Sequence, residues 1–225
     1  MTKRSRKWLV ALSVLSLLLT AAPASSATRW GPNSPHTAIF IFGCEVSAGV
    51  TGALTSIQGT EGPDLIDCSG SFINVVVDGR GGNDVIVGSA NADSLSGGAG
   101  NDQIFSGPGR DVISGGDGDD MIDGFSGNDR ISGNKGNDFL LGAEDNDTVQ
   151  GNEGNDTLGS QFDVPVETSS SNDTLIGGPG KDVLKGGPGI DTLQDVNDAF
   201  VDTLDGQAGF DLCQGNPNDI LISCP

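Results

Sequence analysis

Aliphatic positions recur every nine residues through the middle of the chain. From Gly79 to Gly159 the sequence divides without a gap into nine nonapeptides, and the eighth position of each is aliphatic. The seventh position varies freely, with residues as different as Val85, Arg130 and Phe139. In an extended segment neighbouring side chains point to opposite faces, so one fixed aliphatic position between variable ones predicts that position eight faces inward and positions seven and nine face solvent.

Each nonapeptide therefore predicts one strand of about three residues. The six residues before it are rich in glycine, which supplies positive φ angles and lets backbones approach closely, so they are expected to form a turn. A fixed period held over many copies is typical of a solenoid, in which stacked repeats replace a conventional packed core.

Aspartate occupies the sixth position of all nine copies, directly before the predicted strand. These residues are Asp84, Asp93, Asp102, Asp111, Asp120, Asp129, Asp138, Asp147 and Asp156.

The pattern G-G-x-G-x-D-x-U-x, with U aliphatic, resembles the haemolysin-type calcium-binding repeat of the RTX family. GGAGNDQIF and GGDGDDMID match it fully. Less regular copies extend the resemblance over 59–214, at 59–67, 172–176, 177–185, 186–194 and 206–214, with breaks at 160–171 and 195–205. Position four also departs from glycine, at Asn91 and Asp145.

The resemblance implies an all-β fold, a right-handed parallel β-roll with two nonapeptides per turn. Copies two apart then stack, and calcium ions lie in the loops between successive turns, with about seven such interfaces in the regular section. The expected metal ligands are the nine aspartates above, with Asp173, Asp182 and Asp191 from the later copies, and the loop glycines Gly97, Gly98, Gly100, Gly115, Gly116 and Gly118.

These residue types suit calcium, a hard cation that takes six to eight oxygen ligands from carboxylates and backbone carbonyls. His36 is the only histidine, so imidazole sites for zinc or copper are excluded by ligand supply. Each copy buries a single aliphatic side chain, which stabilises too little to offset the ordering of nine residues. We therefore expect the metal-free chain to be largely disordered and ion binding to drive its folding.

Composition agrees with a repeat protein of this kind. The 225 residues include 36 Gly, only 35% are apolar, and 31 acidic residues face 11 basic ones for a net charge of −20. Such a charge disfavours nucleic acid and anionic membranes as partners and favours cations.

The first 27 residues predict a secretory signal peptide. Four basic residues precede the short apolar run from Trp8 to Thr20, and small residues follow at 22–27. Its removal would leave seven basic residues against 31 acidic ones, a charge of −24, and no further membrane-inserting segment. The predicted organisation is a signal peptide at 1–27, a linker and N-terminal cap at 28–58, repeats at 59–214 and a C-terminal cap at 215–225.

An exported chain would meet an oxidising compartment, so the four cysteines are expected to form two disulfides. Of the three possible pairings, the local one is favoured, because Cys44–Cys68 and Cys213–Cys224 each flank one end of the repeats.

These features predict a secreted, extracellular calcium-binding protein that is not an enzyme, since the nine-residue period accounts for the aspartates without a catalytic role. Two alternatives from other classes are a cell-surface adhesive or structural module and a polysaccharide-modifying β-helix enzyme. The irregular outward positions count against the first, and the absence of Tyr with so few basic residues counts against the second.

Overall fold

The computed structural model describes residues 39–41, 44–46, 51–53, 56–159, 171–195 and 198–224, all within the unit His36–Pro225. The predicted signal peptide, much of the predicted N-terminal cap and nearly all of the insertion at 160–171 lie outside these residues. The described ranges contain strands and turns but no helix, and so no helix that could cross a membrane.

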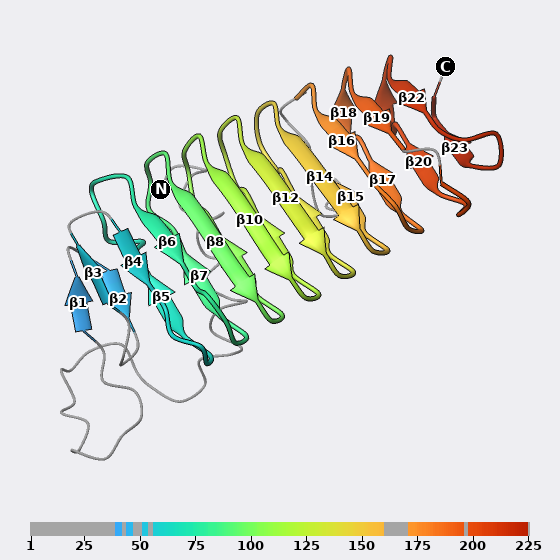
Figure 1. Cartoon of the computed structure of the whole chain (residues 1–225). Helices are drawn as coiled ribbons and strands as arrows, with labels where there is room; N and C mark the ends of the chain where they lie inside the picture. The colour runs from blue at the N-terminus through green and yellow to red at the C-terminus, as the bar shows by residue number, and fades with distance from the viewer. Residues whose placement is uncertain are drawn as a thin grey trace, which may run out of the picture. The chain divides into compact units, whose positions relative to one another are not determined.

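Two long sheets account for most of the strands (Figure 1). The parallel strands of the first sheet are β5 Leu65–Asp67, β7 Val85–Val87, β9 Gln103–Phe105, β11 Met121–Asp123, β13 Phe139–Leu141, β15 Thr157–Gly159, β17 Val183–Lys185, β20 Thr203–Asp205 and β23 Ile220–Ile222. Those of the second sheet are β4 Ser56–Gln58, β6 Val76–Asp78, β8 Ser94–Ala99, β10 Val112–Asp117, β12 Arg130–Lys135, β14 Thr148–Glu153, β16 Thr174–Ile176, β19 Thr192–Gln194 and β22 Leu212–Gln214.

The chain alternates between the two sheets, so that each pair of strands completes one coil. Within each of these two series, every strand pairs in parallel with the strand one coil later. Position eight therefore meets position eight, as at Ile86, Ile104 and Ile122. The result is an all-strand parallel β-solenoid of about nine turns. The predicted fold class is confirmed, and with it the stacking of alternate nonapeptides.

Position-eight side chains form the core as two facing columns. Each is at most 3% exposed from Ile57 to Leu204. The first sheet contributes Ile66, Ile86, Ile104, Ile122, Leu140, Leu158, Leu184 and Leu204, and the second Ile57, Val77, Leu95, Ile113, Ile131, Val149, Leu175 and Leu193. The inward assignment of this position is therefore confirmed. Position nine is not uniformly outward, since Leu141 is also buried.

Four strands of the second sheet are six residues long rather than the three that the sequence predicts. In β8, β10, β12 and β14 the extended conformation continues through the first three positions of the next nonapeptide. These positions pair in register between coils, as Gly98 does with Gly116 and Asn134 with Asn152. Hydrogen bonding between neighbouring coils, which a single repeat does not reveal, extends the strand into the expected turn.

The two irregular stretches leave the solenoid intact. Across the insertion, β14 pairs with β16 and β15 with β17, so the added residues are accommodated without a change of register. At 195–205, β20 still pairs with β17 on one side and β23 on the other. A short pair, β18 Pro188–Gly189 with β21 Ala208–Gly209, joins two loops in this region.

Both predicted disulfides are present at the ends of the solenoid. At the N-terminal end, β1 Ile39–Ile41 and β2 Cys44–Val46 continue the first sheet in antiparallel fashion and β3 Thr51–Ala53 does so for the second. The Cα atoms of Cys44 and Cys68 lie 4.0 Å apart, and those of Cys213 and Cys224 lie 5.9 Å apart. At the C-terminal end the inward position of the last coil, Leu221, is 50% exposed.

Candidate calcium sites

All twelve aspartates expected to bind metal lie in the solenoid wall, where a turn ends and a strand begins. None is more than 4% exposed, although aspartate is among the residues least often buried. Burial of an ionised carboxylate is costly unless hydrogen bonds or a cation compensate the charge.

One oxygen of each carboxylate is used by the fold itself. The Oδ1 atom accepts a hydrogen bond from the backbone N–H of the residue one coil earlier, as Asp102 does from Asp84 and Asp120 does from Asp102, both at 2.8 Å. Repetition of this bond creates one column along each edge of the solenoid. The first contains Asp64, Asp84, Asp102, Asp120, Asp138, Asp156, Asp182, Asp202 and Asp219, and the second Asp93, Asp111, Asp129, Asp147, Asp173, Asp191 and Asp211.

The other oxygen has no hydrogen-bond partner in most of these residues. Buried Oδ2 atoms in this state belong to Asp84, Asp102, Asp111, Asp120, Asp129, Asp138, Asp147, Asp156, Asp182, Asp191, Asp202 and Asp211. A native fold contains few buried polar atoms without partners, and each requires a physical explanation. A series of them, present in most of the nonapeptides, indicates a ligand that the protein chain does not itself supply. Asp93 and Asp173 depart from the series, because their Oδ2 atoms accept hydrogen bonds from Ser89 N–H and the Ser171 hydroxyl.

Glycine at position one lies beside most of the unpartnered oxygens, the exceptions being Asp111, which follows Ser106, and Asp202, which follows Asp195. A Cβ atom at Gly97 would lie within 3.0 Å of both Asp102 Oδ2 and the carbonyl oxygen of Gly115 in the next coil. The same holds at Gly115, between Asp120 Oδ2 and the carbonyl of Gly133. A carboxylate oxygen and a carbonyl oxygen from successive coils thus converge where a side chain is missing.

Burial also raises the pKa values of carboxyl groups in both columns of the metal-free fold, Asp120 and Asp147 among them. Loss of hydration is the largest cause and raises the pKa. The hydrogen bond from the backbone N–H lowers it, and the charges of neighbouring aspartates in the column raise it further. The pKa rises to about 7 for Asp120 and about 8 for Asp147. A nearby cation would reverse this trend, since opposite charge favours the ionised form.

These observations match the requirements of calcium. The converging atoms are all oxygens, they combine carboxylate with carbonyl donors, and they come from two coils, so one ion would link adjacent turns. The predicted glycine ligands lie in this arrangement: the loop of Gly97, Gly98 and Gly100 stacks on that of Gly115, Gly116 and Gly118 through the pairing of β8 with β10.

Comparison with known families agrees with this geometry. The RTX calcium-binding nonapeptide repeat matches in four copies, at residues 78–113, 102–124, 123–158 and 166–193. The chain belongs to this family. The searches of curated proteins and of solved structures returned no match. RTX repeats arranged in a β-solenoid indicate a calcium-binding repeat protein.

The RTX columns extend further than the ligand set expected from the sequence. Asp202, Asp211 and Asp219 continue the two columns by the same Oδ1 hydrogen bond, and Asp64 begins the first column by donating its N–H to Asp84 Oδ1. Asp64 and Asp211 lie in the irregular copies at 59–67 and 206–214, whereas a D-x-U pattern without the preceding glycines was the signal that could have identified Asp202 and Asp219. In the coil at 68–78, Val75 takes the equivalent place and donates its N–H to Asp93.

A second ladder, which sequence reasoning missed, runs through position five on the outside of the RTX coils. There the side-chain Oδ1 accepts the N–H of position five in the following coil, as between Asn83 and Asn101 at 3.0 Å and between Asn137 and Asn155 at 3.0 Å. The recurrence of Asn or Asp at this position is visible in the sequence, but its role depends on which residues stack.

Proposed function

We propose that this RTX repeat protein is secreted, binds several calcium ions between its coils, and acquires its solenoid fold as the ions bind. The observation that carries the proposal is the series of buried carboxylates, most of which have one oxygen fixed by the backbone and the other without a hydrogen-bond partner.

The coupling of folding to binding follows from the charges in each column. Burial is the main reason that the pKa values of Asp120 and Asp129 are raised, and repulsion between carboxylates of successive coils raises them further. A divalent ion between coils converts the repulsion into attraction, and since the unfolded chain cannot form the site, the binding free energy becomes folding free energy.

Secretion is supported by two features. The disulfides at the ends require an oxidising compartment. The basic and apolar segment at 1–27 has the composition of a signal peptide. Outside the cell calcium is abundant, so sites with dissociation constants of roughly 10⁻⁴–10⁻³ M would be filled.

The direct test is far-UV circular dichroism of the oxidised protein in EDTA and during titration with calcium. We expect a disordered spectrum in EDTA and a β spectrum that develops cooperatively with calcium, with magnesium at the same concentration as the control. An identical β spectrum in EDTA and in calcium would contradict the coupling of folding to binding.

A matched pair of variants tests the ligand role of one column. Asp120→Asn keeps the Oδ1 acceptor but removes the buried charge, and should raise the calcium concentration at the folding midpoint several-fold. Asp117→Asn removes the same charge from an exposed residue paired with Lys135 at 2.9 Å, and should leave the midpoint nearly unchanged. Equal effects of the two variants would indicate that only net charge matters.

A further inference from the structure

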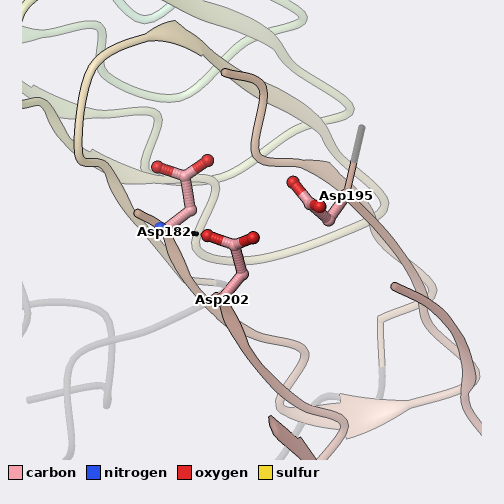
Figure 2. A group of neighbouring side chains, drawn as sticks. All are labelled: Asp182, Asp195 and Asp202. Atoms are coloured by element: carbon pink, nitrogen blue, oxygen red, sulfur yellow. Dashed lines mark hydrogen bonds between the residues drawn. The ribbon is translucent and has the colours of Figure 1, made fainter. Parts of the chain in front are cut away.

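Three carboxylates meet near the C-terminal end of the solenoid, in the stretch where the glycine pattern fails. One oxygen each from Asp182, Asp195 and Asp202 lies within 4.8 Å of the other two (Figure 2). In the part of the chain that the structure describes, no other group of three acidic, histidine or cysteine side chains meets this criterion. Asp182 and Asp202 belong to the first aspartate column, whereas Asp195 belongs to neither.

Asp195 occupies the place of a position-one glycine. Its N–H donates to the carbonyl of Gln214 at 2.8 Å, just as the N–H of Gly177, one coil earlier, donates to Gln194 at 3.0 Å. The repeat that begins at Asp195 is two residues longer than a nonapeptide, and Asp198 in its loop accepts the N–H of Gly180 at 2.8 Å. The longer loop accommodates a carboxylate side chain at a position where the regular coils have glycine or, at Ser106, serine.

The three carboxylates are held in the same way, with one oxygen bound and the other left over. Asp182 Oδ1 accepts the N–H of Asp156, and Asp202 Oδ1 accepts the N–H of Asp182, both at 2.7 Å. Asn216 Nδ2 donates to Asp195 Oδ2 at 2.9 Å.

The remaining oxygens, Asp182 Oδ2, Asp195 Oδ1 and Asp202 Oδ2, are buried without a hydrogen-bond partner. Asp182 and Asp202 are themselves 0% exposed. Figure 2 shows the carboxyl groups of the three residues turned toward a common space.

We propose that Asp182, Asp195 and Asp202 form a separate calcium site, with a ligand set of three carboxylates that the nonapeptide pattern does not contain. The match to the RTX repeat ends at residue 193, before Asp195 and Asp202, so the site goes beyond the function proposed above. At the regular loops one carboxylate oxygen meets a carbonyl oxygen beside a position-one glycine, as at Gly97 and Gly115. A third negative ligand strengthens the attraction for a divalent cation, so this site fills first when calcium is scarce.

Neighbouring acidic groups favour the same outcome. Burial is the main reason that the pKa of Asp195 is raised, and the charges of Asp202, Asp219 and Asp198 raise it further. The oxygens of Asp198 and Asp219 are themselves occupied: Asp198 accepts from Gly180 and Phe200, and Asp219 accepts from Asp202 and Asn216. They add negative potential around the site without competing for the ion.

The test is calorimetric titration of the full oxidised protein with calcium, after exhaustive chelation. The wild type should show one site that fills before the rest, with an affinity roughly tenfold or more above theirs. Two variants should lose this first step and bind one ion fewer. They are Asp195→Asn and Asp195→Gly, the second of which restores the residue usual at position one. Asp205→Asn, which removes a charge in the same coil from a carboxylate that accepts the N–H of Gln207, should titrate like the wild type.

The outcomes separate this inference from the function proposed above. If both Asp195 variants bind as many ions as the wild type with the same first step, the three carboxylates are balanced by protons and the inference is wrong, while calcium binding by the regular loops stands. Crystals of the wild type soaked in terbium give a check that needs no variant: an anomalous peak among the three carboxylates supports the site, and peaks at the regular loops alone overturn it.

Discussion

At the scale of the residue, most aspartates of the two columns have two distinct functions. The Oδ1 atom closes a hydrogen bond to the coil before it, which the fold needs whether or not a metal is present. In these residues the Oδ2 atom is buried and has no hydrogen-bond partner, which only a proton or a cation can compensate. Stability should therefore depend on pH in opposite directions in the absence and in the presence of calcium.

In EDTA the solenoid should gain stability as the pH falls from 8 to 5. The folded pKa values of about 8 for Asp147 and about 7 for Asp120 lie above the value of about 4 expected in the unfolded chain. The folded state therefore binds protons more tightly, and stability is gained as the pH falls through 8 to 6. With calcium the sign reverses, because acid protonates the ligands and releases the ion. Melting curves at pH 8, 6.5 and 5 check both signs, and a metal-free protein less ordered at pH 5 than at pH 8 would contradict the first.

At the scale of the element, a nonapeptide is stable only against its neighbours, because its backbone packs directly on theirs. Position two admits side chains, since residues such as Arg80, Phe125 and Ala143 adopt φ angles of 74°, 66° and 77° there. Position four is more demanding: Gly118 has φ 133°, outside the left-handed region open to other residues, and a Cβ there would lie within 3.0 Å of the carbonyl of Gly100.

Gly118→Ala should therefore destabilise the calcium-loaded protein by about 2 kcal/mol or more. In a domain of this size that corresponds to a melting temperature lower by roughly 4–8 °C. The control is Gly62→Ala at the same repeat position, where a Cβ would meet only Thr60 Oγ1 at 4.0 Å and φ is not in the left-handed range. Equal melting temperatures for the two variants would show that close packing of the coils does not limit stability.

At the scale of the whole solenoid, each coil contacts only the coils before and after it, so stability is expected to be nearly a sum along the axis. The interior coils are sealed on both sides, whereas the last coil leaves Ile220, Leu221 and Ile222 at 43–52% exposed. The Cys213–Cys224 disulfide therefore links the coils at the end of the solenoid where burial is least complete.

Replacement of both cysteines by serine, as Cys213→Ser with Cys224→Ser, should destabilise the C-terminal coils by about 2–4 kcal/mol. Because coupling passes only between neighbours, amide exchange should accelerate in β22 and β23 and remain slow in β10 to β13. Hydrogen exchange followed by mass spectrometry in excess calcium measures both regions in one experiment. Uniform acceleration along the chain would show that the solenoid unfolds as a single cooperative unit.

The sequence by itself determined the period, the inward position and the disulfide pairing. Each of these follows from chemistry repeated within nine residues, as with Ile104 and Asp102, or from the local spacing of the cysteines.

Only the tertiary structure decided what depends on the residue one coil away. The hydrogen bond from Asp84 to Asp102 and the extension of four strands into the turns join residues in successive coils. The meeting of Asp195 and Asp202 with Asp182 likewise brings together residues of different coils. An irregular loop has no period from which to infer its partner, so the place of Asp195 became visible only when the coils were stacked.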